Sequence, residues 1–178
     1  MVKVKTYPLS SENTKQKTNE NAMKIKIISL GGTTEKGYAA LCGEYYKRMG
    51  EVTECDLKPE ALPSDPSDGQ IRAALEKEAD RILAEIPKQS LVIAMCVEGK
   101  QVSSEELADL LSKAALGGKS SVTCIIGSSY GLSDRIKKAA DCRLSLSRLT
   151  LPHKLARLVL AEALYRAGEI NKGTRYHK

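Results

Sequence analysis

Two continuous apolar runs, LVIAM at residues 91–95 and VTCII at residues 122–126, constrain the fold of this chain more than any other feature. A strand that faces water on one side alternates polar and apolar residues, whereas a strand covered by helices on both sides is apolar throughout. A segment with helical spacing, residues 103–116, separates the two runs. The pattern predicts an α/β protein with a mostly parallel sheet and helices on both faces.

The same alternation of strand-like and helix-like segments extends along most of the chain. In a parallel sheet, ligands bind beyond the carboxyl ends of the strands. We therefore look for a ligand site in the loops that follow Met95, Ile126 and Leu146. The expected strands are residues 24–30, 51–57, 91–95, 122–126 and 143–146, and the expected helices are residues 35–49, 70–85, 103–116, 132–140 and 152–167.

Length and composition indicate one folded unit. The chain has 178 residues, of which 42% are hydrophobic and 28% are charged, and this suits a single domain with a full core. We expect that domain to occupy residues 23–178. Residues 1–22 are polar and contain few large apolar side chains, so they are predicted to form a disordered N-terminal extension.

Several classes of protein are disfavoured by composition. No apolar run approaches the roughly 20 residues that cross a bilayer, and the N-terminus lacks the apolar segment of a secretory signal. We expect a soluble, cytoplasmic protein without a membrane partner. Five cysteines without a C-x-x-C pair and only two histidines, His153 and His177, favour reduced thiols and no metal site.

Positive charge is concentrated at the C-terminal end. Residues 135–178 hold eleven Lys or Arg against three acidic residues, an excess of +8, while the whole chain carries +6. Such a segment suits a polyanionic partner, because lysine and arginine release counterions when they meet phosphates. The alternative is a solvated face that only aids solubility.

A glycine-rich loop at residues 31–37 suggests a nucleotide site, but it fails the tests for one. The G-x-G-x-x-G fingerprint would need glycine at Thr34, and a P-loop would need lysine at Tyr38 followed by Ser or Thr at Ala39. A second loop, residues 127–131, joins a strand to a helix and is bounded by glycines, which allow a ligand to approach the backbone closely.

Three motifs in the last third of the chain carry a more specific signal. They are I-I-G-x-x-x-G-L-S from Ile125, L-S-L-S-x-L-T-L-P-H-x-L-A-R-x-x-L-x-E-x-L-Y-R-A from Leu144, and the terminal Y-H-K from Tyr176. Together with M-K-I-K-I-I-S-L-G from Met23, they closely resemble the bacterial large-subunit rRNA pseudouridine N3-methyltransferases of the SPOUT superfamily. The resemblance covers residues 23–178.

The resemblance implies a C-terminal trefoil knot whose loops hold S-adenosylmethionine (SAM). It also implies a homodimer with the active site close to the subunit interface. The implied reaction is methylation of N3 of a pseudouridine in helix 69 of 23S rRNA, after assembly of the 70S ribosome. Carried over residue by residue, the implied cofactor-binding positions are Met95, Gly127, Leu146, Ser147, Arg148, Leu149, Thr150 and Leu151.

Four residues are candidates for the chemistry: His153, Arg157, Tyr176 and His177. The target N3–H must lose its proton, so a histidine can act as the base and an arginine can stabilise the uracil anion. The competing interpretation of His153 is a packed side chain at the start of a helix. For Tyr176 and His177 it is a frayed C-terminal tail.

The chain departs from the family pattern at Cys96, Ser128 and Tyr130, where relatives usually carry an acidic residue, a second glycine, and an acidic or small polar residue. Met95 replaces leucine, a swap that conserves volume. These departures motivate one alternative to an active enzyme, a catalytically weakened relative that binds RNA or the ribosome. A separate alternative is a regulator with a flavodoxin-like sheet that binds an acidic metabolite or a nucleotide, with a phosphate ligand at residues 31–37.

Overall fold

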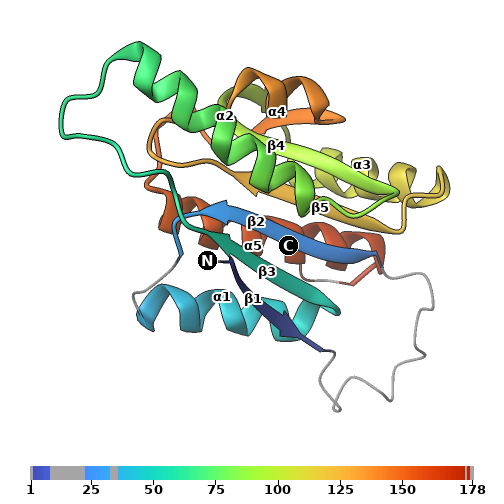
Figure 1. Ribbon diagram of the computed structural model, residues 1–178. Coiled ribbons are helices and arrows are strands. Elements are labelled where there is room, and N and C mark those ends of the chain that lie inside the picture. The colour runs from blue at the N-terminus through green and yellow to red at the C-terminus, as the bar shows by residue number, and fades with distance from the viewer. Residues whose placement is uncertain (1, 9–22, 33–35, 175, 177–178) are drawn as a thin grey trace.

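A computed structural model describes residues 2–8, 23–32, 36–174 and 176. Strands and helices alternate through most of this part of the chain, as the sequence predicts (Figure 1). The strands are β1 (Val2–Tyr7), β2 (Lys24–Leu30), β3 (Val52–Leu57), β4 (Ser90–Gln101), β5 (Ser121–Ile126) and β6 (Cys142–Ser145). The helices are α1 (Lys36–Met49), α2 (Asp68–Ala84), α3 (Ser104–Leu116), α4 (Asp134–Ala139) and α5 (His153–Asn171).

The six strands form one sheet in the order β1-β3-β2-β5-β4-β6. All neighbours pair in parallel except β1, which pairs antiparallel with β3. The two apolar runs of the sequence lie in β4 and β5, which are interior strands of this sheet. The predicted mostly parallel sheet is therefore confirmed.

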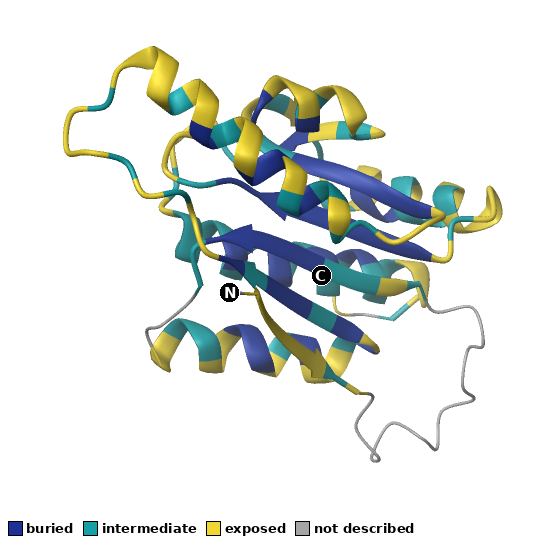
Figure 2. Ribbon diagram, viewed as in Figure 1, coloured by how far each residue is buried: buried dark blue, intermediate teal, exposed yellow. Residues whose placement is uncertain are grey.

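Helices cover both faces of the sheet, as predicted. On one face α1, α3 and α5 pack over a core that includes Tyr46, Leu107 and Leu164, and on the other α2 and α4 pack over a core that includes Ile82 and Ile136 (Figure 1). Buried residues concentrate in the strands and on the inner sides of the helices (Figure 2). Double-sided burial explains why β4 and β5 lack alternating polar residues.

Local sequence fixes where two of the helices begin. Ser67 and Gln70 at the start of α2, and Ser103 and Glu106 at the start of α3, form reciprocal capping boxes. Each box satisfies backbone N–H groups that the first helical turn leaves without a partner. These helices therefore begin close to the predicted positions.

Strand β1 corrects the prediction that residues 1–22 are disordered. Residues 2–7 pair with β3 in a register that places Lys3 opposite Asp56 and Lys5 opposite Glu54. Opposite charges in directly facing positions stabilise a strand pair. The prediction was wrong for residues 2–7 because it considered only the composition of the segment, whereas the free edge of β3 supplies the backbone partners. Residue 1 and residues 9–22 of the segment lie outside the described residues.

Strand β4 is longer than the predicted residues 91–95. It continues to Gln101, and its register with β6 shifts between Met95 and Lys100, so that both of these residues face Leu144. Gly99 makes this approach possible, since a Cβ built on it would lie 2.5 Å from the backbone carbon of Leu144. The shift sets residues 96–99 apart from the regular ladder at the edge where a ligand is expected.

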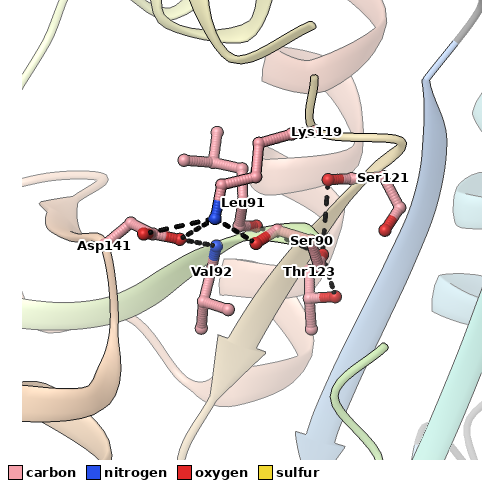
Figure 3. A network of polar contacts seen from close by, with 7 residues as sticks. All are labelled: Ser90, Leu91, Val92, Lys119, Ser121, Thr123 and Asp141. Carbon is pink, nitrogen blue, oxygen red and sulfur yellow. Dashed lines mark hydrogen bonds and ion pairs between the residues drawn. The ribbon is translucent and has the colours of Figure 1, made fainter. Parts of the chain in front are cut away.

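A polar network fixes the opposite, amino-terminal end of β4 (Figure 3). The Asp141 carboxylate accepts a hydrogen bond of 2.7 Å from the Val92 N–H. Lys119 reaches the same carboxylate at 3.4 Å and donates to the Ser90 carbonyl at 2.9 Å. Because Asp141 immediately precedes β6, the network anchors the beginning of β6 to β4 and β5.

Candidate active site

A cavity of about 660 Å³ lies at the carboxyl ends of β4, β5 and β6. This is the edge at which ligands bind parallel sheets, and the volume is in the range of small-molecule sites. The loops after Met95, Ile126 and Leu146 all contribute to its wall, as the sequence predicts. Of the residues that the resemblance implies for the cofactor, the cavity is lined by Met95, Gly127, Leu146, Ser147, Leu149, Thr150 and Leu151.

The loop after β5 requires glycine for steric reasons. A Cβ built on Gly127 would lie 2.2 Å from the Gly131 carbonyl oxygen, which no side chain can tolerate. Gly131 has a φ of +83°, and its N–H donates to the Ser128 carbonyl at 2.9 Å. The loop is therefore a tight turn that brings its own backbone to the cavity wall.

The structure accommodates the two departures in this loop. Ser128 does not need the freedom of glycine, because Gln89 is the only non-glycine residue with positive φ among the residues that the structure describes. Its hydroxyl donates to the buried Glu78 carboxylate at 3.0 Å. Tyr130 is 46% exposed and lines the cavity without closing it.

Short hydrogen bonds organise the loop between β6 and α5. The Ser145 hydroxyl donates to the Ser147 carbonyl at 2.8 Å, and the Leu149 N–H donates to the Ser147 hydroxyl at 2.9 Å. Turns of this type hold backbone groups in fixed directions. Arg148 belongs to the same loop but is not among the residues that line the cavity.

Sequence reasoning missed a charged pair at the cavity. Glu98 and Lys137 both line it and form an ion pair of 2.6 Å. The hydrogen bond from Lys137 holds the pKa of the Glu98 carboxyl below its usual value. Glu98 lies in the part of β4 beyond the predicted end of the strand. The sequence signal that could have found it is the acidic residue two positions after Cys96, directly beyond an apolar strand.

His153 lies between the cavity and the end of β2. It lines the cavity wall, and its Nε2 lies 3.6 Å from the position of a Cβ built on Gly31. Pro152, which precedes it, holds extended backbone angles and its carbonyl accepts from the Ala156 N–H at 2.9 Å, which starts α5. The structure thus places this predicted catalytic residue at the candidate site.

Arg157 lies one helical turn further on and is 2% exposed. Its guanidinium contacts Glu54 at 3.2 Å and Asp56 at 2.5 Å, and it also donates to the Ser29 hydroxyl. It is not among the residues that line the cavity. Its buried positive charge is therefore paired with carboxylates of β3.

Tyr176 lies near the other end of α5. Its ring packs edge-on against Tyr165 at 4.7 Å between centroids, and the Arg166 guanidinium lies 5.0 Å from its centroid. Arg166 also pairs with Glu162 at 2.6 Å. At 1.5 Å per residue, Tyr165 is about 18 Å along the helix from His153. Tyr176 is therefore remote from the cavity of its own chain, and His177 lies outside the described residues.

Comparison with known proteins agrees with this geometry. Residues 23–177 match the family model described as a predicted SPOUT methyltransferase. The chain belongs to the SPOUT methyltransferase family. The match spans β2 to the C-terminal segment and so contains the cavity, whereas β1 precedes it. This SPOUT methyltransferase is thus an enzyme that transfers a methyl group.

Curated relatives are similar over nearly the whole chain. Proteins named ribosomal RNA large subunit methyltransferase H from Streptococcus suis and Listeria monocytogenes are each 45% identical to the chain over 159 residues. The protein of the same name from Lactococcus lactis is 41% identical over 159 residues. Each alignment covers 88% of this SPOUT methyltransferase and 100% of the relative.

A solved structure supports the fold. The structure of a probable methylase family protein from Haemophilus influenzae aligns with a TM-score of 0.51 and 16% identity, covering 88% of this chain and 71% of that one. No helix in the described part of this SPOUT methyltransferase is long and apolar enough to span a membrane. Its described residues also contain no group of three His, Cys, Asp or Glu placed to hold a metal ion.

Proposed function

We propose that this protein uses SAM to methylate N3 of a pseudouridine in helix 69 of 23S rRNA, within the assembled ribosome. The observation that carries the proposal is the cavity at the ends of β4, β5 and β6, whose wall contains Met95, Gly127 and the loop before α5. The names of the curated relatives support ribosomal RNA as the substrate. The excess of positive charge in residues 135–178 is consistent with an RNA partner.

The residues of the cavity fit the proposed cofactor. Gly127 leaves no room for a side chain, so backbone N–H and C=O groups of its loop are accessible to an adenine edge. Aliphatic side chains of Leu146, Leu149 and Leu151 can enclose the ring. When bound, SAM supplies an electrophilic methyl group on a sulfonium. The loop between β6 and α5, the expected site of the trefoil knot, would hold it.

Residues of the chain align the acceptor and remove its proton. Bringing donor and acceptor into line accounts for much of the acceleration of a methyl transfer. His153 lines the cavity, so we propose that it accepts the N3 proton as a general base. General-base catalysis raises a reaction rate roughly 10²–10⁴-fold. Arg157 is buried against two carboxylates, and we therefore assign it the positioning of α5 rather than contact with the uracil anion.

The position of Tyr176 supports a homodimer with composite sites. Tyr176 packs on Tyr165, about 18 Å along α5 from His153, so it does not reach the cavity of its own chain. The face formed by α1 and α5 exposes Leu41 and leaves Tyr45 and Tyr165 partly exposed. We propose that two copies pair along this face, so that Tyr176 and His177 of one copy complete the site of its partner.

Two measurements test the proposed reaction. Calorimetric titration with SAM should show binding to the full-length chain. The absence of binding at millimolar SAM would refute the proposed SAM-dependent reaction. Mass spectrometry of 23S rRNA from a strain lacking the protein should show loss of one methyl group from helix 69. Complementation should restore that methyl group.

A complementation experiment tests the composite site. A His153→Ala variant and a variant lacking residues 176–178 should each be inactive alone. Mixed and allowed to exchange subunits, they should regain about a quarter to a half of wild-type activity, since one site in a mixed dimer is intact. Failure to regain activity despite proven subunit exchange would contradict shared sites.

The structure gives less support to the two alternatives. Cys96, Ser128 and Tyr130 suggest a weakened relative, but Ser128 forms a hydrogen bond with Glu78, and Cys96 and Tyr130 line the cavity without closing it. A phosphate ligand at residues 31–37 would meet the Asp56 carboxylate, which lies 3.0 Å from a Cβ built on Gly32. The negative charges of a phosphate and this carboxylate would repel each other.

A further inference from the structure

A second cavity of about 240 Å³ lies on the other side of the glycine loop. Ser128, Ser129 and Tyr130 line both this cavity and the larger one, so one short segment separates the two. The remaining wall comes from the loop between β3 and α2 and from the first turns of α2. An occupant of the second cavity would therefore lie directly beside the proposed methylation site.

The walls of this second cavity suit a flat, partly apolar group. Pro59, Leu62, Pro63 and Ile71 supply apolar surface on the side of the loop and α2. Tyr130, in the glycine loop, also lines the cavity and is 46% exposed. An exposed aromatic ring at the border of a narrow apolar space is a typical stacking platform for a nucleobase.

The polar groups of the cavity are hydrogen-bond acceptors. Glu78 is only 4% exposed, and its two carboxylate oxygens accept from the Ser128 hydroxyl at 3.0 Å and from the Glu60 N–H at 2.9 Å. A carboxylate offers about four acceptor positions, so further donors can be accommodated. The Glu60 carboxylate also borders the cavity, and Arg81 contacts it at 2.7 Å.

These features exclude some occupants. The described lining contains two carboxylates and neither lysine nor arginine, so it disfavours a phosphate. The amino-acid end of the cofactor is also a poor match, because it carries its own carboxylate on the same carbon as its ammonium group. A neutral base that presents an amino group to Glu78 fits better, because it brings neither a phosphate nor a carboxylate into the cavity.

We propose that the second cavity binds the nucleobase next to the methylated nucleotide. The base stacks on Tyr130, and an exocyclic amino group, as in cytosine or adenine, donates to the Glu78 carboxylate. Uracil lacks such a group and is the disfavoured base. This inference rests on the proposed function, since it assigns the cavity to the same RNA strand that delivers the target.

Binding of a free nucleoside tests the cavity independently of catalysis. The full-length, ¹⁵N-labelled chain is first saturated with S-adenosylhomocysteine, which occupies the larger cavity, and is then titrated with cytidine or uridine. Cytidine should shift the amide signals of Ser129 and Ile71 and should bind about tenfold more tightly than uridine. Equal binding of the two nucleosides, or no shift with millimolar cytidine, would overturn the proposal. It would also be overturned if S-adenosylhomocysteine alone filled the second cavity and blocked cytidine.

A variant that fills the cavity tests its use by the substrate. Ile71→Trp should raise the KM for unmethylated ribosomes about tenfold, while kcat and the affinity for SAM stay at wild-type values. Ala73→Trp, which adds the same side chain at an exposed position of α2 outside the cavity, is the matched control and should leave all three unchanged. An unchanged KM in a folded Ile71→Trp variant would overturn the proposal. If the wild-type chain methylates no ribosomes, the proposed function fails, and the cytidine titration still decides whether the cavity binds a base.

Discussion

The carboxyl ends of β2 and β3 lie at the same edge of the sheet as those of β4 and β5, yet the two halves of this edge differ. At β2 and β3, which we call the closed half, the buried Arg157 guanidinium contacts Glu54 and Asp56. At β4 and β5 the edge is open and forms the larger cavity. The first half binds a side chain of its own protein, and the second is available to a ligand.

Helix α5 connects the two halves. Its Arg157 is held in the closed half, and His153, four residues earlier, lines the open one. Residues four apart lie on the same side of a helix, so fixing one of them orients the other. The closed half therefore acts as an anchor for the first turn of α5. Substitutions in the two halves therefore separate anchoring from ligand binding.

Removing the anchor should destabilise the protein most. Arg157→Ala leaves Glu54 and Asp56 without their buried cation, and we expect a loss of about 3–5 kcal/mol in the free energy of unfolding, measured with urea. Arg135→Ala is the matched control. Arg135 also contacts two carboxylates, Glu76 at 3.1 Å and Asp80 at 2.6 Å, but its side chain is 43% exposed. Arg135→Ala should lower the free energy of unfolding by less than about 1 kcal/mol. Equal losses in the two variants would contradict the anchoring role of Arg157.

A methyl group in the open half should impair ligand binding. Gly127→Ala forces the loop away from the Gly131 carbonyl, and we expect SAM to bind at least about tenfold more weakly by calorimetry, with about 1–3 kcal/mol lost in stability. Gly37→Ala, in α1, meets no atom within 4 Å and should change neither quantity by much. Wild-type cofactor affinity in Gly127→Ala would refute the proposed site.

Strand β1 should support the closed half to a smaller extent. The Tyr7 hydroxyl donates to Glu54 at 3.3 Å, so Tyr7→Phe should cost about 0.5–1 kcal/mol while keeping the ring contact with Tyr46. Burial, followed by the nearby Glu54 charge, raises the Tyr7 pKa from 10.0 to about 12. The folded state favours the protonated hydroxyl, so the stability advantage of wild type over Tyr7→Phe should be complete below pH 10.

The pH dependence provides the check on that interpretation. Between pH 10 and 12 the stability advantage of wild type over Tyr7→Phe should be lost, because the unfolded chain releases the Tyr7 proton before the folded chain does. Denaturation curves at several pH values in this range measure the difference. A difference that stays constant up to pH 12 would show that the Tyr7 hydroxyl does not contribute in this way.

The smallest expected effect concerns Cys96, which lines the open half. Burial, followed by the Glu98 charge, raises the pKa of its thiol above the usual value. Because the thiolate is the reactive form, iodoacetamide should modify Cys96 more slowly than a peptide cysteine at pH 8, and faster as the pH rises. Saturating SAM should slow the reaction further, as measured by peptide mass spectrometry. Protection absent at saturation would argue that the cofactor lies elsewhere in the cavity.

Much of the fold was predictable because its signals are local. The strands at residues 24–30 and 122–126 follow from apolar runs, and capping residues such as Ser67 and Ser103 mark helix starts. The loops that line the larger cavity were also predictable, since they follow strands whose apolar runs mark the carboxyl edge of the sheet. The assignment of individual residues to the cofactor came from the family resemblance and stays a prediction. Strand β1 was missed because its stability depends on β3, about 50 residues away.

The sequence alone determined the alternation of strands and helices, the glycine at position 127 and the loops that line the cavity. Only the tertiary structure decided how charged and aromatic side chains are used. It buried Arg157 against carboxylates about 100 residues away, and it placed Tyr176 far from His153. Apolar periodicity is a property of each segment, whereas the partner of a charge depends on which segments the fold brings together.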